Sequence, residues 1–137
     1  MANQLTVTGH VKQTCEFSID DLHHMDAEQQ VEDVSQLGFR RSGRAVRLDS
    51  LLRAAETDPN ANRLKLISST DNFTADVPLA EAAKTALVIY TVEGKPLDKD
   101  AGGPFRFWIP NHTACGESEL DACANVKSLD RVEAYRH

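Results

Sequence analysis

Arginine is the residue type in this chain whose spacing most directly suggests chemistry, because four arginines fall within eight consecutive positions. They are Arg40, Arg41, Arg44 and Arg47. A guanidinium group donates two parallel hydrogen bonds to a phosphate or a carboxylate, so a cluster of this density suits an anionic cofactor or substrate. The alternative is a charged loop face that meets only solvent, and the sequence pattern leaves both interpretations open.

Cysteine chemistry is a second candidate, and the spacing argues against most forms of it. Cys15, Cys115 and Cys123 are an odd number in a sequence without a secretory signal pattern, so we expect reduced thiols. Seven residues separate the last two. This is neither the Cys-x-x-Cys spacing of redox enzymes nor the close spacing of most zinc sites, so we expect no structural zinc.

The composition is typical of one soluble domain. Of the 137 residues, 41% are hydrophobic and 26% are charged, which is enough apolar material for one core over residues 1–137. The longest apolar run, residues 86–90, is far too short to span a membrane, and we expect a cytoplasmic location. The net charge of -6 argues against a general nucleic-acid binder, because phosphate binding depends on a positive field.

Hydrophobic periodicity predicts the elements that must position these groups. Alternating or β-branched patterns predict strands at residues 5–11, 29–37, 63–69, 73–77, 86–92 and 105–109. Helical spacing and cap signals predict helices at residues 19–25, 48–55 and 78–85. Val126, Leu129 and Val132 should anchor a terminal turn and strand, after a polar loop at residues 111–121. Strands interleaved with short helices indicate an α+β domain with mixed sheets.

Several motifs in order resemble one known family. The chain opens with Leu-x-Val-x-Gly and Phe-Ser-Ile-Asp-Asp-Leu, and continues with Gly-x-x-Val-x-Leu-x-x-Leu-Leu at residues 43–52. Gly-Gly-Pro-Phe-Arg at residues 102–106 is later followed by Ala-Asn-Val-Lys at residues 124–127. This series resembles the molybdopterin-binding domain of the sulfite oxidase family. The resemblance implies a sulfite oxidase catalytic-domain-like α+β fold with mixed β-sheets, and molybdopterin (the molybdenum cofactor) as the cofactor of an oxidoreductase.

The same resemblance shows departures at the positions where the family carries out its chemistry. In the family, a pterin dithiolene and a cysteine thiolate hold molybdenum, and oxo transfer at the metal oxidises or reduces a small substrate. Gln36 stands at the position of that cysteine, and Phe73 stands at the position of a tyrosine in the substrate pocket. A neutral amide binds such a metal poorly, and phenylalanine lacks the hydroxyl. Ala124 and Ser128 also replace an arginine and a tryptophan that the family prefers.

The resemblance further implies which residues would hold the pterin. They are the cations Arg40, Arg41, Arg106 and Lys127 and the hydrogen-bonding residues Asn111, His112 and Asn125. The sequence pattern leaves simpler interpretations open. Arg106 alternates with core aromatic residues and could face solvent, Lys127 has the same alternative, and His112 could be an ordinary loop histidine.

Three hypotheses follow for the function. The first, which we favour, is a molybdopterin-binding oxidoreductase-like pseudoenzyme that has lost normal molybdenum catalysis. It either retains the pterin as a binding or carrier module or keeps only the fold. The second is an active molybdenum oxidoreductase for a small oxyanion or sulfoxide, with Cys115 or His112 as the replacement metal ligand. The third is a cofactor-free module that binds a partner protein through residues 111–121 or a sheet edge.

One spatial relation separates these hypotheses. A degenerate cofactor site requires that Gln36 lines one pocket with Arg106, Lys127 and Phe73. If these residues scatter, the residue-by-residue correspondence with the family fails. Its expected occupant is a pterin cofactor or a small anion, with neither nucleic acid nor membrane as a partner.

Overall fold

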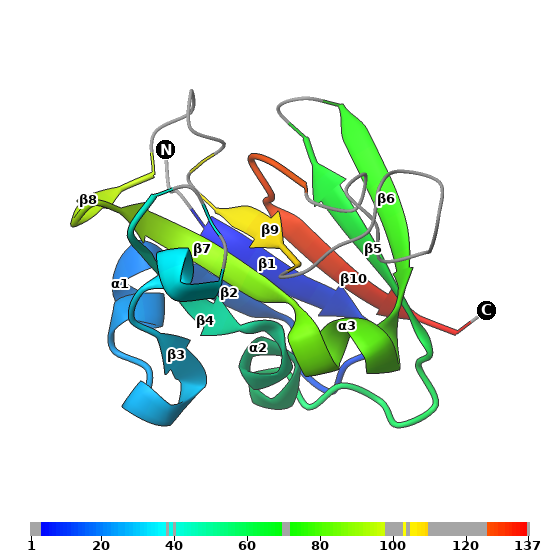
Figure 1. The fold of residues 1–137 in the computed structure, drawn as a ribbon. Coiled ribbons are helices and arrows are strands. Elements are labelled where there is room, and N and C mark those ends of the chain that lie inside the picture. The colour runs from blue at the N-terminus through cyan, green and yellow to red at the C-terminus, as the bar shows by residue number, and fades with distance from the viewer. Residues whose placement is uncertain are drawn as a thin grey trace.

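The computed structural model describes residues 4–37, 39, 41–69, 72–97, 103, 105–109 and 126–136. Within these residues the strands form two sheets joined by short helices (Figure 1). The helices are α1 (Ile19–His23), α2 (Leu48–Ala54) and α3 (Leu79–Thr85), with two 3₁₀ helices, η1 (Ala27–Gln29) and η2 (Val34–Leu37). None of the described helices has the length and apolar composition needed to cross a bilayer.

The first sheet has the strand order β2-β1-β10-β5-β6. Its strands are β1 (Gln4–Gly9), β2 (Cys15–Ser18), β5 (Arg63–Ser68), β6 (Phe73–Pro78) and β10 (Arg131–Tyr135). β1 and β10 are parallel, whereas the other neighbours are antiparallel. Alternate residues, such as Leu5 and Val7 in β1 and Leu64 and Leu66 in β5, are fully buried on one face. The period of two in the sequence therefore sets which face packs on the core.

The second sheet has the order β3-β4-β7-β8, with β9 also paired to β7. Its strands are β3 (Gln30–Val31), β4 (Gly43–Arg47), β7 (Leu87–Val92), β8 (Lys95–Pro96) and β9 (Arg106–Trp108). Strand β7 is buried on both faces. Val88 and Tyr90 belong to the main core, whereas Leu87 and Ile89 belong to a smaller cluster with Val34 of η2.

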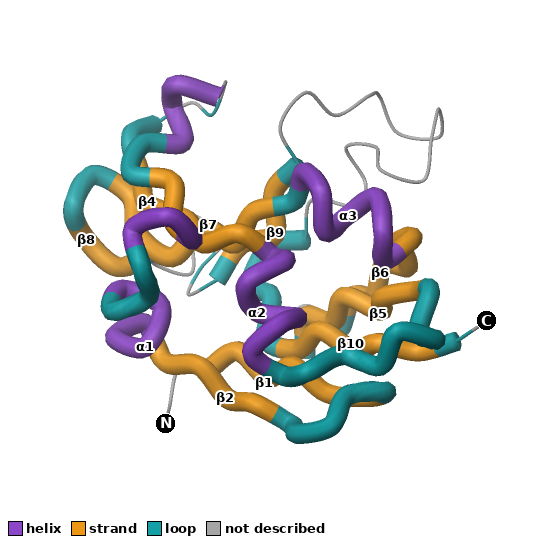
Figure 2. Tube along the Cα trace, turned by 90° about the horizontal axis from the view of Figure 1, so that it is seen from below, coloured by secondary structure: helices purple, strands orange, loops and turns teal. Residues whose placement is uncertain are grey.

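The main core joins the two sheets through α2. Leu48, Leu51 and Leu52 of this helix pack in the same cluster as Leu5 of the first sheet and Val88 of the second. Figure 2 shows α2 between the two sheets, with α3 beside it. The sequence explains the helix because its apolar residues recur at i, i+3 and i+4 and so share one face.

The expected mixed α+β architecture is confirmed, and most elements lie close to their expected positions. The terminal anchors Val126, Leu129 and Val132 are buried as expected. Helix α1 begins as its cap signal predicts, because Ser18 and Asp21 form a reciprocal capping box. The expected loop at residues 111–121 lies outside the described residues.

One expected element is wrong. The strand predicted for residues 29–37 is limited to Gln30–Val31, and Val34–Leu37 forms the 3₁₀ helix η2 instead. The Asp33 carboxylate accepts hydrogen bonds from Ser35 N at 3.0 Å and Ser35 Oγ at 2.6 Å. Local side-chain bonds of this kind compete with strand pairing and turn the chain, which is why the apolar spacing alone was misleading.

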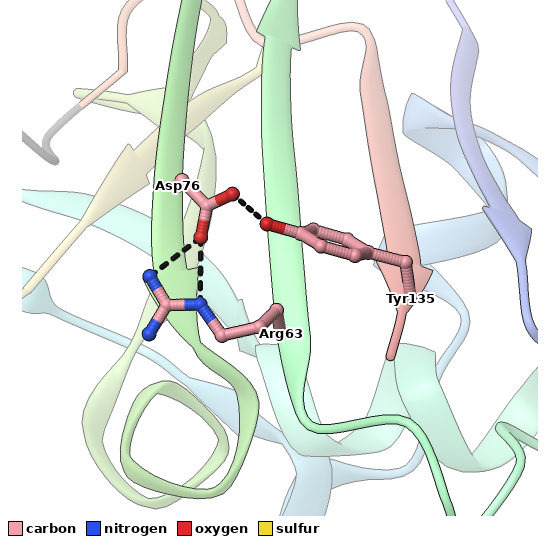
Figure 3. Close-up of polar contacts among 3 residues, drawn as sticks. All are labelled: Arg63, Asp76 and Tyr135. Carbon is pink, nitrogen blue, oxygen red and sulfur yellow. Dashed lines mark hydrogen bonds and ion pairs between the residues drawn. The ribbon is translucent and has the colours of Figure 1, made fainter. Parts of the chain in front are cut away.

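A cluster of polar side chains links three strands on the outer face of the first sheet (Figure 3). Asp76 of β6 accepts two contacts from Arg63 of β5, from Nε at 2.8 Å and from the terminal nitrogen at 2.6 Å. The hydroxyl of Tyr135 in β10 donates to the other Asp76 oxygen, and Lys65 Nζ lies 5.7 Å from the Tyr135 ring centroid. One carboxylate therefore ties β6 to both β5 and β10.

We expect Asp76→Asn to make stability less dependent on pH under acid conditions. Burial raises the pKa of Asp76, but the hydrogen bonds from Tyr135 and Arg63 and the Arg63 charge bring that pKa below the usual 3.8. The carboxylate therefore stabilises the fold above that value, and its contribution is lost as pH falls through the lower folded-state pKa. In urea unfolding, the wild type should exceed the variant by about 1 kcal/mol or less near neutral pH, because the pair is partly exposed.

That stability difference should shrink as pH falls from about 4 to about 2. Asp26→Asn is the control, because Asp26 is exposed and makes no side-chain capping bond. A difference between wild type and Asp76→Asn that stayed constant with pH would contradict the assignment.

Candidate functional site

Two cations predicted to hold a cofactor lie on neighbouring backbone segments. Arg106 is on β9, where it pairs with Ile89 of β7. Lys127 is in the turn formed by residues 126–129, called here the lysine turn. This turn is bonded to β9, because Phe107 N donates to Val126 O at 2.9 Å and Leu129 N donates to Phe105 O at 2.8 Å. The tertiary fold thus brings together two residues that are distant in the sequence.

The segment after the lysine turn is tied to the first sheet beside Phe73. Asp130 N donates to Ile67 O at 3.0 Å, and Ser69 N donates to the Asp130 carboxylate at 3.2 Å. Phe73 is opposite Ser68 in the β5–β6 register, and its side chain is 44% exposed. Phe73 and Lys127 therefore lie at the same end of the first sheet, where β5 ends and β6 and β10 begin.

The loop that contains Gln36 reaches Arg106 through Phe39. The Phe39 ring contacts the Trp108 ring edge-on, with centroids 5.3 Å apart, and the Arg106 guanidinium lies 5.1 Å from the Phe39 centroid. A cation over an aromatic face is stabilised by the ring's quadrupole. Arg106 is therefore half-buried against Phe39, and the simpler interpretation of a solvent-facing strand residue is wrong.

Sequence reasoning did not identify Phe39 as part of this arrangement. The alternation along residues 105–109 would leave Trp108, like Arg106, on the face of the strand away from the main core. Trp108 is instead only 5% exposed. The period of two correctly placed Arg106 and Trp108 on one face of β9. The missing information was that η2 and Phe39 cover that face, and no local pattern around residue 39 indicates this.

Arg41 is paired within the chain. Its guanidinium contacts Glu93 Oε1 from Nε at 2.7 Å and from a terminal nitrogen at 2.5 Å, and both side chains are about half exposed. An incoming anion would therefore have to compete with Glu93 for this arginine. Arg44 and Arg47 lie on β4, where the backbone N–H of Arg44 donates to Thr91 Oγ1 at 3.1 Å.

The remaining predicted pterin-binding residues are not placed by the structure. Arg40, Asn111, His112 and Asn125 lie outside the described residues, as do Cys115 and Cys123. Their assignment stays a prediction from the sequence resemblance.

The described residues at this end fit an anion better than they fit a molybdenum–thiolate centre. Arg106 and Lys127 supply positive charge, as a phosphate-bearing cofactor requires. Gln36 is exposed and carries a neutral amide, which is a poor ligand for such a metal.

Cys15, the cysteine among the described residues, does not supply the missing thiolate. Its Sγ lies 3.6 Å from Ala54 O at the end of α2, and it packs on the main core from the edge strand β2. Helix η2, which carries Gln36, covers the opposite face of the second sheet.

Comparisons with known proteins agree with the expected fold. A family model described as oxidoreductase molybdopterin binding domain matches residues 42–137. Among solved structures, the sulfane dehydrogenase SoxCD from Paracoccus pantotrophus is similar over 98% of this chain, with a TM-score of 0.73 and 16% identity. The chain spans 38% of that protein's chain, and a likeness at this identity shows the fold alone. No curated protein matches the chain by sequence.

Asp33 holds the loop that carries Gln36 at both of its ends. Its carboxylate binds Ser35 near the start, and Ser42 Oγ near the end at 3.4 Å. The hydrogen bonds from the Ser35 side chain and backbone, and then from Ser42, lower the pKa of Asp33 below 3.8. The carboxylate is therefore ionised and keeps its acceptor role at neutral pH.

We expect Asp33→Ala to loosen this loop without unfolding the domain. The amide of Ser35, which donates to Asp33, should exchange with solvent on the order of tenfold faster, as measured by hydrogen–deuterium exchange. Glu32→Ala is the matched control, because Glu32 is the neighbouring exposed acid. Unchanged exchange at residues 35–42 in Asp33→Ala would show that the loop is held by its packing alone.

Proposed function

Because this chain belongs to the oxidoreductase molybdopterin-binding domain family, with residues 42–137 matching the family model, we propose that it binds a molybdopterin-type pterin without normal molybdenum redox catalysis. The observation that carries this proposal is the composition of one end of the two sheets. The cations Arg106 and Lys127 lie there on bonded segments, whereas the segment that reaches Arg106 through Phe39 carries Gln36 in place of a thiolate.

The binding half of the proposal rests on charge and placement. The phosphate of a molybdopterin cofactor is an anion, and guanidinium and ammonium groups are the side chains that bind it most strongly. Arg106 is already ordered by Phe39 and β7, so little side-chain freedom remains to be lost on binding. Arg40, Asn111, His112 and Asn125 would complete this site, on the resemblance described above.

The second half of the proposal, the absence of normal molybdenum catalysis, rests on which atom residue 36 offers to a metal. A protein thiolate is a soft anionic ligand, and the Gln36 amide cannot replace it. The family-model match begins at residue 42, after Gln36. The correspondence between Gln36 and the family's cysteine therefore belongs to this proposal, and it rests on residues 36–42, which read Gln-Leu-Gly-Phe-Arg-Arg-Ser where the family carries Cys-Ala-Gly-Asn-Arg-Arg-Ser. Phe73 removes a second polar group, because its ring has neither a donor nor an acceptor.

Family membership also favours a second candidate. In an active molybdenum oxidoreductase, Cys115 or His112 would supply the metal ligand in place of Gln36, and the substrate would be a small oxyanion or sulfoxide. The two candidates differ in the ratio of molybdenum to pterin, so one measurement separates them.

The test is to measure molybdenum by mass spectrometry and pterin by the fluorescence of its oxidised form, on protein purified from a host that makes the molybdenum cofactor. We expect pterin with molybdenum well below one atom per pterin. Equal amounts of both would support the active enzyme and overturn the catalytic half of the proposal. Neither, in a host that loads a control molybdoenzyme, would overturn both halves and favour an interaction module.

Three variants make this test specific. Arg106→Met and Lys127→Met should each lower the pterin retained per chain by about tenfold, the loss expected for one charge-assisted contact of about 1.4 kcal/mol. Lys65→Met is the matched control, because Lys65 is an exposed lysine on the outer face of the first sheet. Gln36→Cys restores a thiolate and should raise the molybdenum-to-pterin ratio. An unchanged ratio would mean that residue 36 is not at the metal position.

A further inference from the structure

The lysine turn is held more tightly than an exposed loop needs to be. Val126 and Leu129 at its two ends are 1% and 0% exposed, whereas Lys127 at its tip is exposed. Two backbone hydrogen bonds to β9 fix its ends, as described above. Both ends of the turn are therefore fixed, and Lys127 is the exposed residue between them.

Ser128 has an uncommon backbone conformation. Its φ is 53°, in the left-handed region that residues other than glycine seldom adopt, and its side chain is 6% exposed. Such a conformation persists only where the surroundings hold it, and residues of this kind concentrate at binding sites and turns that must keep one shape. Here the holding contact is a hydrogen bond from Ser128 Oγ to Gly103 O at 2.9 Å.

The acceptor of that bond is itself rigidly placed. A Cβ added to Gly103 would lie 2.2 Å from Leu97 O, so the backbone passes Leu97 at a distance that only glycine allows. Leu97 N in turn donates to Tyr90 O of the buried strand β7 at 3.3 Å. A series of contacts therefore runs from the central strand through Leu97 and Gly103 to Ser128.

We propose that Ser128 is a positioning residue that orients the Lys127 side chain. It thereby sets how long the anionic end of the pterin cofactor is retained. This inference rests on the proposed pterin binding, and it concerns a position where the chain departs from its family's preferred tryptophan. The serine hydroxyl orders the backbone of the turn before the ligand arrives. The turn and Lys127 then lose less conformational entropy when Lys127 binds an anion.

The test uses the pterin-loaded protein and measures the rate at which pterin is lost on dilution. Ser128→Ala removes the hydroxyl, and Ser128→Gly removes it while also relieving the left-handed strain. Both should lose pterin about threefold to tenfold faster than the wild type, at a temperature where circular dichroism shows every variant folded. Ser128→Gly keeps the experiment interpretable if Ser128→Ala folds poorly.

Glu56→Gly is the matched control, because Glu56 has the same φ of 53°. It lies at the opposite end of β10, where its carbonyl accepts from Lys12 N just beyond β1. Relief of strain there should leave the rate of pterin loss unchanged. Faster loss from Glu56→Gly would mean that general loosening explains the effect, and it would overturn the proposal.

A double-mutant cycle with Lys127→Met separates positioning from a structural role. If Ser128 acts through Lys127, Ser128→Gly should have no further effect on pterin loss in the Lys127→Met background. An equal effect in both backgrounds, or wild-type retention by both Ser128 variants, would overturn this inference and leave pterin binding intact. A wild-type protein without pterin would instead remove the proposed function and this inference together.

Discussion

The rest of this structure depends on the burial of β7 on both of its faces. Leu87, Val88, Ile89 and Tyr90 are consecutive and between 0% and 4% exposed, so two separate layers must cover the strand. Each fully buried aliphatic side chain contributes about 1.5–3 kcal/mol, which makes either layer costly to remove. One layer is the main core with α2, and the other is the short segment around η2 and Phe39.

The segment that covers the outer face of β7 also forms part of the candidate site. The segment that covers the outer face of β7 is the segment that carries Gln36, and the same cover brings Phe39 over Arg106. The other edge of β9 is occupied by the lysine turn. The contacts that cover β7 therefore also bring Phe39 and Arg106 together.

The polar contacts show how the covering segments are held. Tyr90 is fully buried, and its hydroxyl donates to Gln30 Oε1 at 2.5 Å, while Gln30 Nε2 donates to His23 O and Met25 O. These hydrogen bonds connect the end of α1 and the residues after it to β7. Burial also raises the pKa of Tyr90, although the nearby Arg44 charge opposes this. Buried polar groups need such partners, because an unpaired one costs about 1–3 kcal/mol.

The two cations and Gln36 bear on different parts of the proposed function. Arg106 and Lys127 are kept at one end of the sheets, whereas Gln36 lacks the charge and softness of a thiolate. A scaffold that holds an anion and a centre that transfers oxygen make separate demands on the sequence. Binding an anion requires positive charge at the right place, whereas a molybdenum centre requires one specific donor atom.

Much of the fold could be predicted from the sequence, because the relevant interactions are local or periodic. Alternation identified β1, β5, β6 and β9, and apolar spacing identified α2. Ser18 and Asp21 marked the start of α1 through a capping box that spans three residues. The apolar residues of the terminal segment also identified the buried anchors Val126 and Leu129.

The tertiary structure alone decided the arrangement of the candidate site. The pairing of Arg41 with Glu93, the position of Phe39 over Arg106 and the bond from Ser128 to Gly103 all join residues far apart in the chain. The 3₁₀ helix η2 replaced an expected strand because Asp33 bonds Ser35 locally and β7 needs a cover. Periodicity in the sequence indicates only which residues are buried. Which segment of the chain covers them is decided by tertiary packing on the two faces of β7.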